Sequence, residues 1–130
     1  MIQSLQTERH CIAAALRHPN ILADVSTFVK EDDFSETHKV IYSVIIDFLA
    51  KDETISTFRV AEKIQNAGIS LSKLEVSPQD YLDDLKLITI TEQAAIESFK
   101  ELKKISLRKE LWGLGKSIQD AMTKNGNMSV

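Results

Sequence analysis

The chain has little cysteine, proline and glycine, and it has no long run of apolar residues. Its 130 residues include one cysteine, two prolines and four glycines. The single cysteine, Cys11, cannot form a disulfide within the chain. No apolar segment approaches the ~20 residues that a helix needs to span a bilayer. The first residues also lack the basic flank and apolar run of a secretory signal. The sequence therefore predicts a cytoplasmic protein that does not interact with a membrane.

The chain also lacks an excess of basic residues. It has 16 lysines and arginines against 19 aspartates and glutamates, which gives a formal net charge of −3. Proteins that grip nucleic acid neutralise phosphates with lysine and arginine, so this balance argues against DNA binding as the main task. Any contact with DNA is expected to be weak, local or indirect.

Sustained alternation of apolar and polar residues is absent, and this predicts an all-α fold. Residues 85–91 are rich enough in β-branched side chains that a short extended piece stays an alternative. The predicted helices cover residues 5–16, 20–28, 35–50 and 57–67, a fifth begins at Pro78 and carries Tyr81, Leu82 and Leu85, and a last helix runs from about 92 to 124. Length and composition match one domain: a globular helical head over 1–92, a long helix over 93–125, and a polar tail or linker over 126–130.

The helix predicted over 35–50 has the widest apolar face in the chain. It follows the acidic turn at 31–34, and six of its apolar residues lie on one helical face: Val40, Ile41, Val44, Ile45, Phe48 and Leu49. A face this wide has to be buried. We therefore expect it to be the central helix of the core.

Breaks between the helices are marked by residues with known positional preferences. Pro19 disfavours helical geometry at the residue before it, so the first helix should end there. Asn20 is then expected to cap the second helix, and Ser56 or Thr57 the fourth, in which Phe58 should point inward. Ser77 followed by a proline and an acid is a strong start signal for the fifth helix.

The long last helix changes its apolar register along its length. Ile96, Phe99 and Leu102 share one face and can close the core of the head. Further along, a second set recurs at intervals of 4, 3, 4 and 4 residues, as in a coiled-coil seam: Leu107, Leu111, Leu114, Ile118 and Met122. Either the head folds back over this seam, or a partner chain or a further helix downstream of residue 130 covers it.

No catalytic, cofactor-binding or metal-binding site is predicted. Residues 115–117 (GKS) match the end of a phosphate-binding loop, but the glycine required five residues earlier is replaced by Glu110. The histidines and Cys11 lack the spacing of a structural zinc site. The adjacent acids at 31–33 are more typical of helix N-terminal residues than of a catalytic pair.

Two further features of the long helix are candidate partner contacts. Four basic residues form a stripe along one side of it: Lys100, Lys103, Lys104 and Arg108. The stripe could contact an acidic partner or DNA, but a solvated helix face is the more common meaning of such a pattern. Trp112 lies off the seam, and it is either an anchor for a partner or a residue packed against the head.

The order and spacing of several segments carry a resemblance to a known family. They are residues 8–16 (ERHCIAAAL), 29–34 (VKEDDF), 38–42 (HKVIY), 55–64 (ISTFRVAEKI), 81–82 (YL) and 107–111 (LRKEL). Over about residues 5–125 the chain resembles the N-terminal domain of DnaB-type replicative DNA helicases. No single segment is diagnostic, so the specificity lies in their order.

The resemblance implies a non-catalytic part of a larger machine. In this family a helical head carries a helical hairpin, hairpins pair between subunits to build a hexameric collar, and primase and helicase loaders dock on it. ATP and Mg²⁺ belong to the motor domain of the parent helicase, which implies an ATP-dependent DNA helicase, in the host cytoplasm if the gene is carried by a phage. The seam then corresponds to the first arm of the hairpin.

A free-standing helical adaptor, such as a helicase loader or a helicase-binding decoy, is the alternative function. The two functions predict different coding sequence beyond residue 130. A helicase gene should continue into a second helix and a complete phosphate-binding loop, whereas a stop codon there would favour the adaptor.

Overall fold

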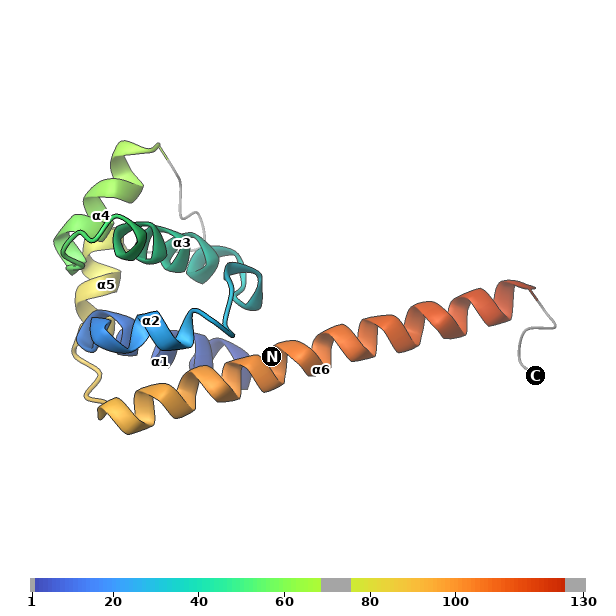
Figure 1. Ribbon diagram of the computed structural model, residues 1–130. Coiled ribbons are helices and arrows are strands. Elements are labelled where there is room, and N and C mark those ends of the chain that lie inside the picture. The colour runs from blue at the N-terminus through green and yellow to red at the C-terminus, as the bar shows by residue number, and fades with distance from the viewer. Residues whose placement is uncertain (1, 69–75, 126–130) are drawn as a thin grey trace.

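The computed structural model describes residues 2–68 and 76–125, and their side chains over 5–68 and 76–111. The regular structure in these ranges is all helical, which confirms the predicted fold class, and residues 87–91 form turn and coil with no strand. The α-helices are α1 (Ile2–Arg17), α2 (Leu22–Val25), α3 (Glu36–Ala50), α4 (Thr57–Asn66), α5 (Pro78–Lys86) and α6 (Glu92–Asn125), with short 3₁₀ helices η1 (Pro19–Ile21) and η2 (Glu31–Asp33). Figure 1 shows α1 to α5 gathered in a head, from which α6 projects.

The helix ends follow the signals in the sequence closely. α1 ends at Arg17, two residues before Pro19, which opens the 3₁₀ turn η1. Ser56 caps α4, since its Oγ accepts a hydrogen bond from the backbone N–H of Arg59 at 3.2 Å. Ser77 caps α5 in the same way through the N–H of Asp80, also at 3.2 Å. These side chains satisfy backbone donors that the first helical turn leaves unpaired.

The centre of the head is α1 rather than α3, contrary to the expectation from the width of the apolar face of α3. Every residue of α1 from 11 to 16 is at most 4% exposed, and α1 packs against α3, α5 and α6. Ala13, Ala14 and Ala15 are fully buried. Their small side chains let neighbouring helices approach α1 on more than one side, so the central position depends on side chains that carry little hydrophobic signal of their own.

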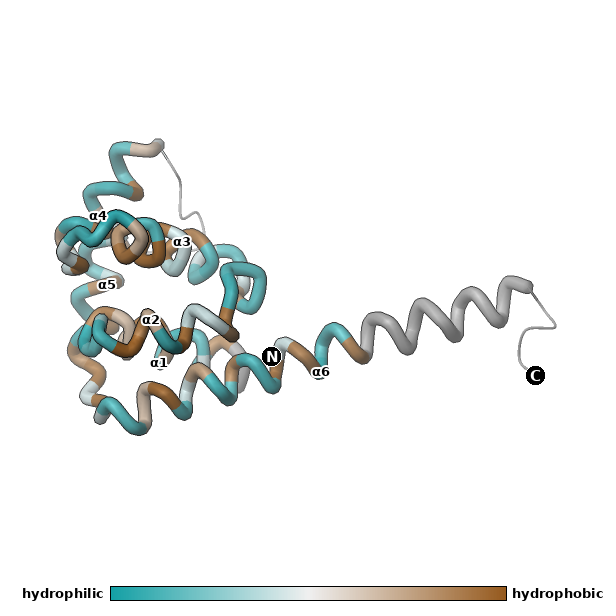
Figure 2. The backbone as a smooth tube through the Cα atoms, in the orientation of Figure 1, coloured by the Kyte–Doolittle hydropathy of each residue, from teal (hydrophilic) through white to brown (hydrophobic). Residues whose placement is uncertain are grey.

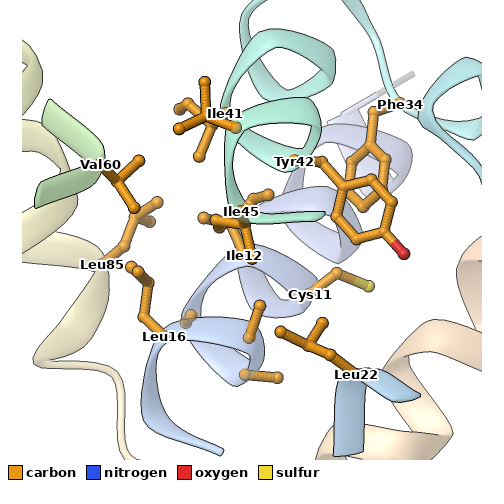
Figure 3. Packing of buried hydrophobic residues seen from close by; sticks show 14 of the residues in the cluster. Cys11, Ile12, Leu16, Leu22, Phe34, Ile41, Tyr42, Ile45, Val60 and Leu85 are labelled. Carbon is orange, nitrogen blue, oxygen red and sulfur yellow. The ribbon is translucent and has the colours of Figure 1, made fainter. Parts of the chain in front are cut away.

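α3 forms one wall of the core. Ile41 and Ile45 are fully buried and face α1, α4 and α5 in the packed interior that Figure 3 shows. The ring of Tyr42 lies against that of Phe34, with centroids 4.5 Å apart. Val40 and Leu49, at the margins of the apolar face, are only partly buried.

Two side chains do not lie where the sequence suggested. Asn20 does not cap α2, which has no side-chain cap; its amide donates to Glu92 Oε1 at 3.1 Å and so joins the first turn after α1 to the start of α6. Phe58 is 62% exposed. It lies on the polar face of α4, because Val60, Ala61 and Ile64 already fill the inward face of this short helix.

α6 runs as one helix of 34 residues, about 51 Å long at 1.5 Å per residue. Its backbone stays helical through positions 113 and 115, where the sequence has glycine. Thr91 caps its first turn, because its Oγ1 accepts a hydrogen bond from the N–H of Ala94 at 3.1 Å. Within the described ranges, none of the helices combines the length and apolar character that crossing a membrane requires.

Candidate functional site

The first third of α6 is fixed to the head by apolar packing. Ala95, Phe99 and Leu102 are at most 1% exposed, and Ile96 packs partly against the same core. These residues lie along α1, the helix that α6 contacts most extensively. The prediction that this register closes the core is therefore confirmed, and in Figure 2 the apolar positions alternate with polar ones along this part of α6.

A polar contact marks the point where α6 leaves the head. The Asp33 carboxylate, whose side chain is 5% exposed, accepts a hydrogen bond from the hydroxyl of Ser106 and lies 3.3 Å from the ammonium of Lys103. It also accepts a hydrogen bond from the backbone N–H of Lys30 at 2.8 Å, which closes the turn η2. Ser106 is the last buried residue of α6 among those whose side chains are described.

Beyond Ser106 the seam residues emerge from the head. We call residues 107–125 of α6 the arm. Leu107 is 44% exposed and Leu111 is 68% exposed, so the head does not fold back over them. Figure 1 shows the arm pointing away from the other helices. The remaining seam residues lie on the helical backbone of the arm, but their side chains fall outside the described residues: Leu114, Ile118 and Met122.

The four residues of the basic stripe do not share one environment. Lys100, Lys104 and Arg108 are exposed on α6, whereas Lys103 is turned toward Asp33 with 30% of its side chain accessible. Three of the four cations are therefore presented to solvent, and the fourth takes part in the contact with the head. The side chain of Trp112 lies outside the described residues.

The family of the chain follows from comparison with known proteins. A family model for the DnaB-like helicase N-terminal domain matches residues 1–104. The chain belongs to this DnaB-like family. The crystal structure of the N-terminal domain of DnaB helicase from Mycobacterium tuberculosis is similar to it, with a TM-score of 0.81 and 21% sequence identity over 94% of this chain and 86% of that chain. Among curated protein sequences, none matches the chain significantly.

The head of this DnaB-like domain contains a buried polar network that connects residues from three helices. Glu8 of α1 is 1% exposed, and its Oε1 accepts hydrogen bonds from the backbone N–H of Ser35 at 2.9 Å and from the hydroxyl of Ser35 at 2.7 Å. Nδ1 of His38 lies 2.9 Å from the same oxygen. On its other side, Nε2 of His38 lies 2.6 Å from the hydroxyl of Tyr81 on α5.

Burial and hydrogen bonding act in opposite directions on Glu8. Burial by itself raises the pKa of a carboxyl, but the hydrogen bonds from His38 and from Ser35 outweigh it and hold the pKa of Glu8 below 4.5. Burial also raises the pKa of the Tyr81 hydroxyl. Glu8 is therefore an ionised carboxylate at neutral pH with three hydrogen-bond contacts to one of its oxygens, and it joins α1 to α3 and, through His38, to α5.

The sequence reasoning missed this network, although one signal was present. Glu8 lies three residues after Leu5 and four before Ile12, so an acid interrupts the apolar face of α1. A charge at such a position requires buried donors. The network is too enclosed for chemistry on a substrate, since Glu8 is 1% and His38 5% exposed. Among the described residues, no group of three histidine, cysteine or acidic side chains could hold a metal ion.

Proposed function

We propose that this DnaB-like domain is the assembly and docking domain of a replicative DNA helicase. In this proposal the arm is the first arm of a helical hairpin and pairs with the arm of a second copy, and paired subunits build a hexameric ring. The observation that carries the proposal is the exposure of Leu107 and Leu111 on a helix whose preceding turns bury one face in the head.

The physical argument is the free energy of covering the arm. Fully burying a leucine side chain contributes about 1.5–3 kcal/mol, and the five seam residues recur at coiled-coil intervals. Leu111 leaves about two thirds of its surface in water, at 68% exposure, and Leu107 leaves 44%. A second helix with the same seam would cover both, and a second copy of this chain supplies one.

The other partners in the proposal are primase and a helicase loader, with DNA contacted only weakly or indirectly. The exposed cations Lys100, Lys104 and Arg108 are the side chains offered for an acidic partner surface, and Trp112 is a candidate anchor beside them. The domain itself needs no cofactor. ATP and Mg²⁺ would be bound by the motor domain of the parent helicase, which would carry out ATP-dependent unwinding in the cytoplasm.

Assembly is tested by measuring molar mass with light scattering over a range of protein concentrations. The chain alone has a mass of 14.6 kDa, and we expect a concentration-dependent mass approaching that of a pair. Leu107→Glu with Leu111→Glu should return the mass to that of one chain, because two charges would be buried in the seam. The matched control is Lys104→Glu with Arg108→Glu, which places the same residue on the exposed stripe of the same helix and should leave pairing intact.

The proposal is contradicted if the unaltered protein has the mass of one chain at every concentration. It is also contradicted if the Lys104→Glu, Arg108→Glu variant loses pairing as completely as the Leu107→Glu, Leu111→Glu variant. Docking is tested separately by titrating purified primase, and in a second series the loader, against the control variant. If that variant binds primase or the loader more weakly than the unaltered chain does, and still pairs, the stripe is part of the surface that binds that protein.

A further inference from the structure

We propose that Asp33 is a positioning residue that sets the direction in which the arm leaves the head. Asp33, Lys103 and Ser106 together form what we call the Asp33 anchor. This inference goes beyond the proposed function, because it concerns the geometry of a single chain and holds whether or not the arm pairs with another copy.

The first part of the argument is that Asp33 is itself fixed. The backbone N–H of Lys30 donates to its carboxylate at 2.8 Å. The next residue, Phe34, is 5% exposed, and its ring packs at a tilt against that of Tyr42 of α3. The turn η2 is therefore attached to the core on one side and presents the carboxylate to α6 on the other.

The second part is the position of the two donors on α6. Lys103 and Ser106 are three residues apart, so they lie on one face of the helix. The Ser106 hydroxyl donates to one carboxylate oxygen, and Lys103 Nζ lies 3.3 Å from the other. Both contacts occur in the last turn of α6 before the exposed Leu107.

The third part is a difference in the kind of contact. Ala95, Phe99 and Leu102 hold α6 through apolar packing, which depends on buried area and has little directional preference. Hydrogen bonds depend strongly on angle as well as distance. The apolar contacts therefore keep α6 on the head, and the Asp33 anchor selects one tilt of the helix among those that the apolar contacts allow.

The experiment measures the distance between the head and the arm in the intact chain. Spin labels are attached to cysteines introduced by Glu62→Cys on α4 and Asp120→Cys on the arm, and labelled protein is diluted into an excess of unlabelled protein so that distances between chains do not contribute. Burial raises the pKa of the Cys11 thiol well above its usual value, so a short reaction labels the introduced cysteines first.

Position 120 lies roughly 21 Å beyond Ser106 along the helix, so a tilt of about 20° displaces it by roughly 7 Å. We expect one narrow distance distribution for the unaltered anchor. Asp33→Asn, which keeps the size of the side chain but replaces one acceptor oxygen by a donor, should broaden the distribution and shift it by several ångströms. Lys103→Met with Ser106→Ala should produce the same distribution, and adding Asp33→Asn to that pair should change it no further.

The matched control is Lys104→Met, an exposed lysine next to Lys103 on the same helix. It should leave the distribution narrow, and circular dichroism should show full helicity for every variant. An unchanged distribution in Asp33→Asn, or equal broadening in Lys104→Met, would overturn the role of the anchor. Neither outcome would bear on pairing, which the molar mass reports independently.

Discussion

Nδ1 of His38 lies 2.9 Å from Oε1 of Glu8, although 30 residues separate the two in the sequence. The contact joins the helix at the centre of the head to the helix that forms its wall. Because both side chains are almost completely excluded from water, the hydrogen bonds between them and their neighbours are a condition for burying the charge of Glu8 at all.

Replacing Glu8 by glutamine should change how stability depends on pH. A carboxyl whose pKa is lower in the folded chain stabilises it fully above the unfolded pKa, here near 4.5, and this contribution is lost as the pH falls through the folded value. We expect Glu8→Gln to lower the free energy of unfolding by about 1.5–3 kcal/mol at neutral pH, the range for hydrogen bonds to charged groups. The difference from the unaltered chain should shrink as the pH falls below 4.5.

The measurement is urea unfolding of both proteins at a series of pH values. Glu101→Gln, an exposed acid on α6, is the control and should leave the pH profile unchanged. A Glu8→Gln profile that runs parallel to that of the unaltered chain at every pH would refute the assigned role of this carboxylate.

Tyr42→Phe should destabilise the head by about 1 kcal/mol, the net value of one hydrogen bond. The Tyr42 hydroxyl donates to the backbone carbonyl of Val29 at 3.0 Å, and the variant leaves that buried acceptor unpaired. The ring contact with Phe34 would remain, so thermal unfolding should stay cooperative. Phe34→Leu, which removes the ring partner and keeps the hydroxyl, separates the two contributions. A loss of stability in Phe34→Leu alone would mean that the ring contact matters and the hydrogen bond does not.

Ala14→Leu tests the packing around α1. Ala14 is fully buried, and extra atoms there must displace neighbouring helices, which costs about 1–3 kcal/mol or more. Ala50→Leu, at the exposed end of α3, is the matched control and should be nearly neutral. Chemical denaturation of both variants gives the comparison. If the two variants are equally stable, there is room beside Ala14 for a larger side chain, which would contradict the close packing of α1 in the structure.

Arg17→Met tests the connection between α5 and α6. The guanidinium of Arg17 donates to the carbonyl of Lys86 at 2.7 Å and to that of Ile88 at 3.2 Å, so it holds the residues between the two helices. We expect a loss of about 1 kcal/mol in unfolding free energy, below the usual range for hydrogen bonds to charged groups because the side chain is exposed. Hydrogen exchange should also become faster at residues 87–91. Unchanged exchange there would show that Arg17 does not restrain this connection.

The order of the elements was predictable from the sequence because their boundaries are decided locally. Pro19 ends the first helix, and Ser56 and Ser77 cap the fourth and fifth, through chemistry confined to one turn. The first apolar register of α6 also predicted that Phe99 closes the core, whereas the sequence left open whether the head covers Leu111, which is exposed.

The remaining features depend on tertiary contacts that no local pattern encodes. Asn20 has a distant partner, Glu92, that competes with capping, and Lys103 is drawn from the basic stripe by Asp33. The central position of α1 depends on Ala14 and its neighbours, whose small side chains matter for how closely helices approach rather than for how apolar they are.

The burial of α1 also restricts where other proteins can reach the head. Residues 11–16 are at most 4% exposed, so this part of the helix has almost no surface that another protein could contact. A protein that contacts the head therefore has to use surfaces other than residues 11–16. The helix that holds the head together is therefore the one that can change least without disturbing its neighbours α3, α5 and α6, whereas substitutions on the exposed sides of α4 and α6 leave the core intact.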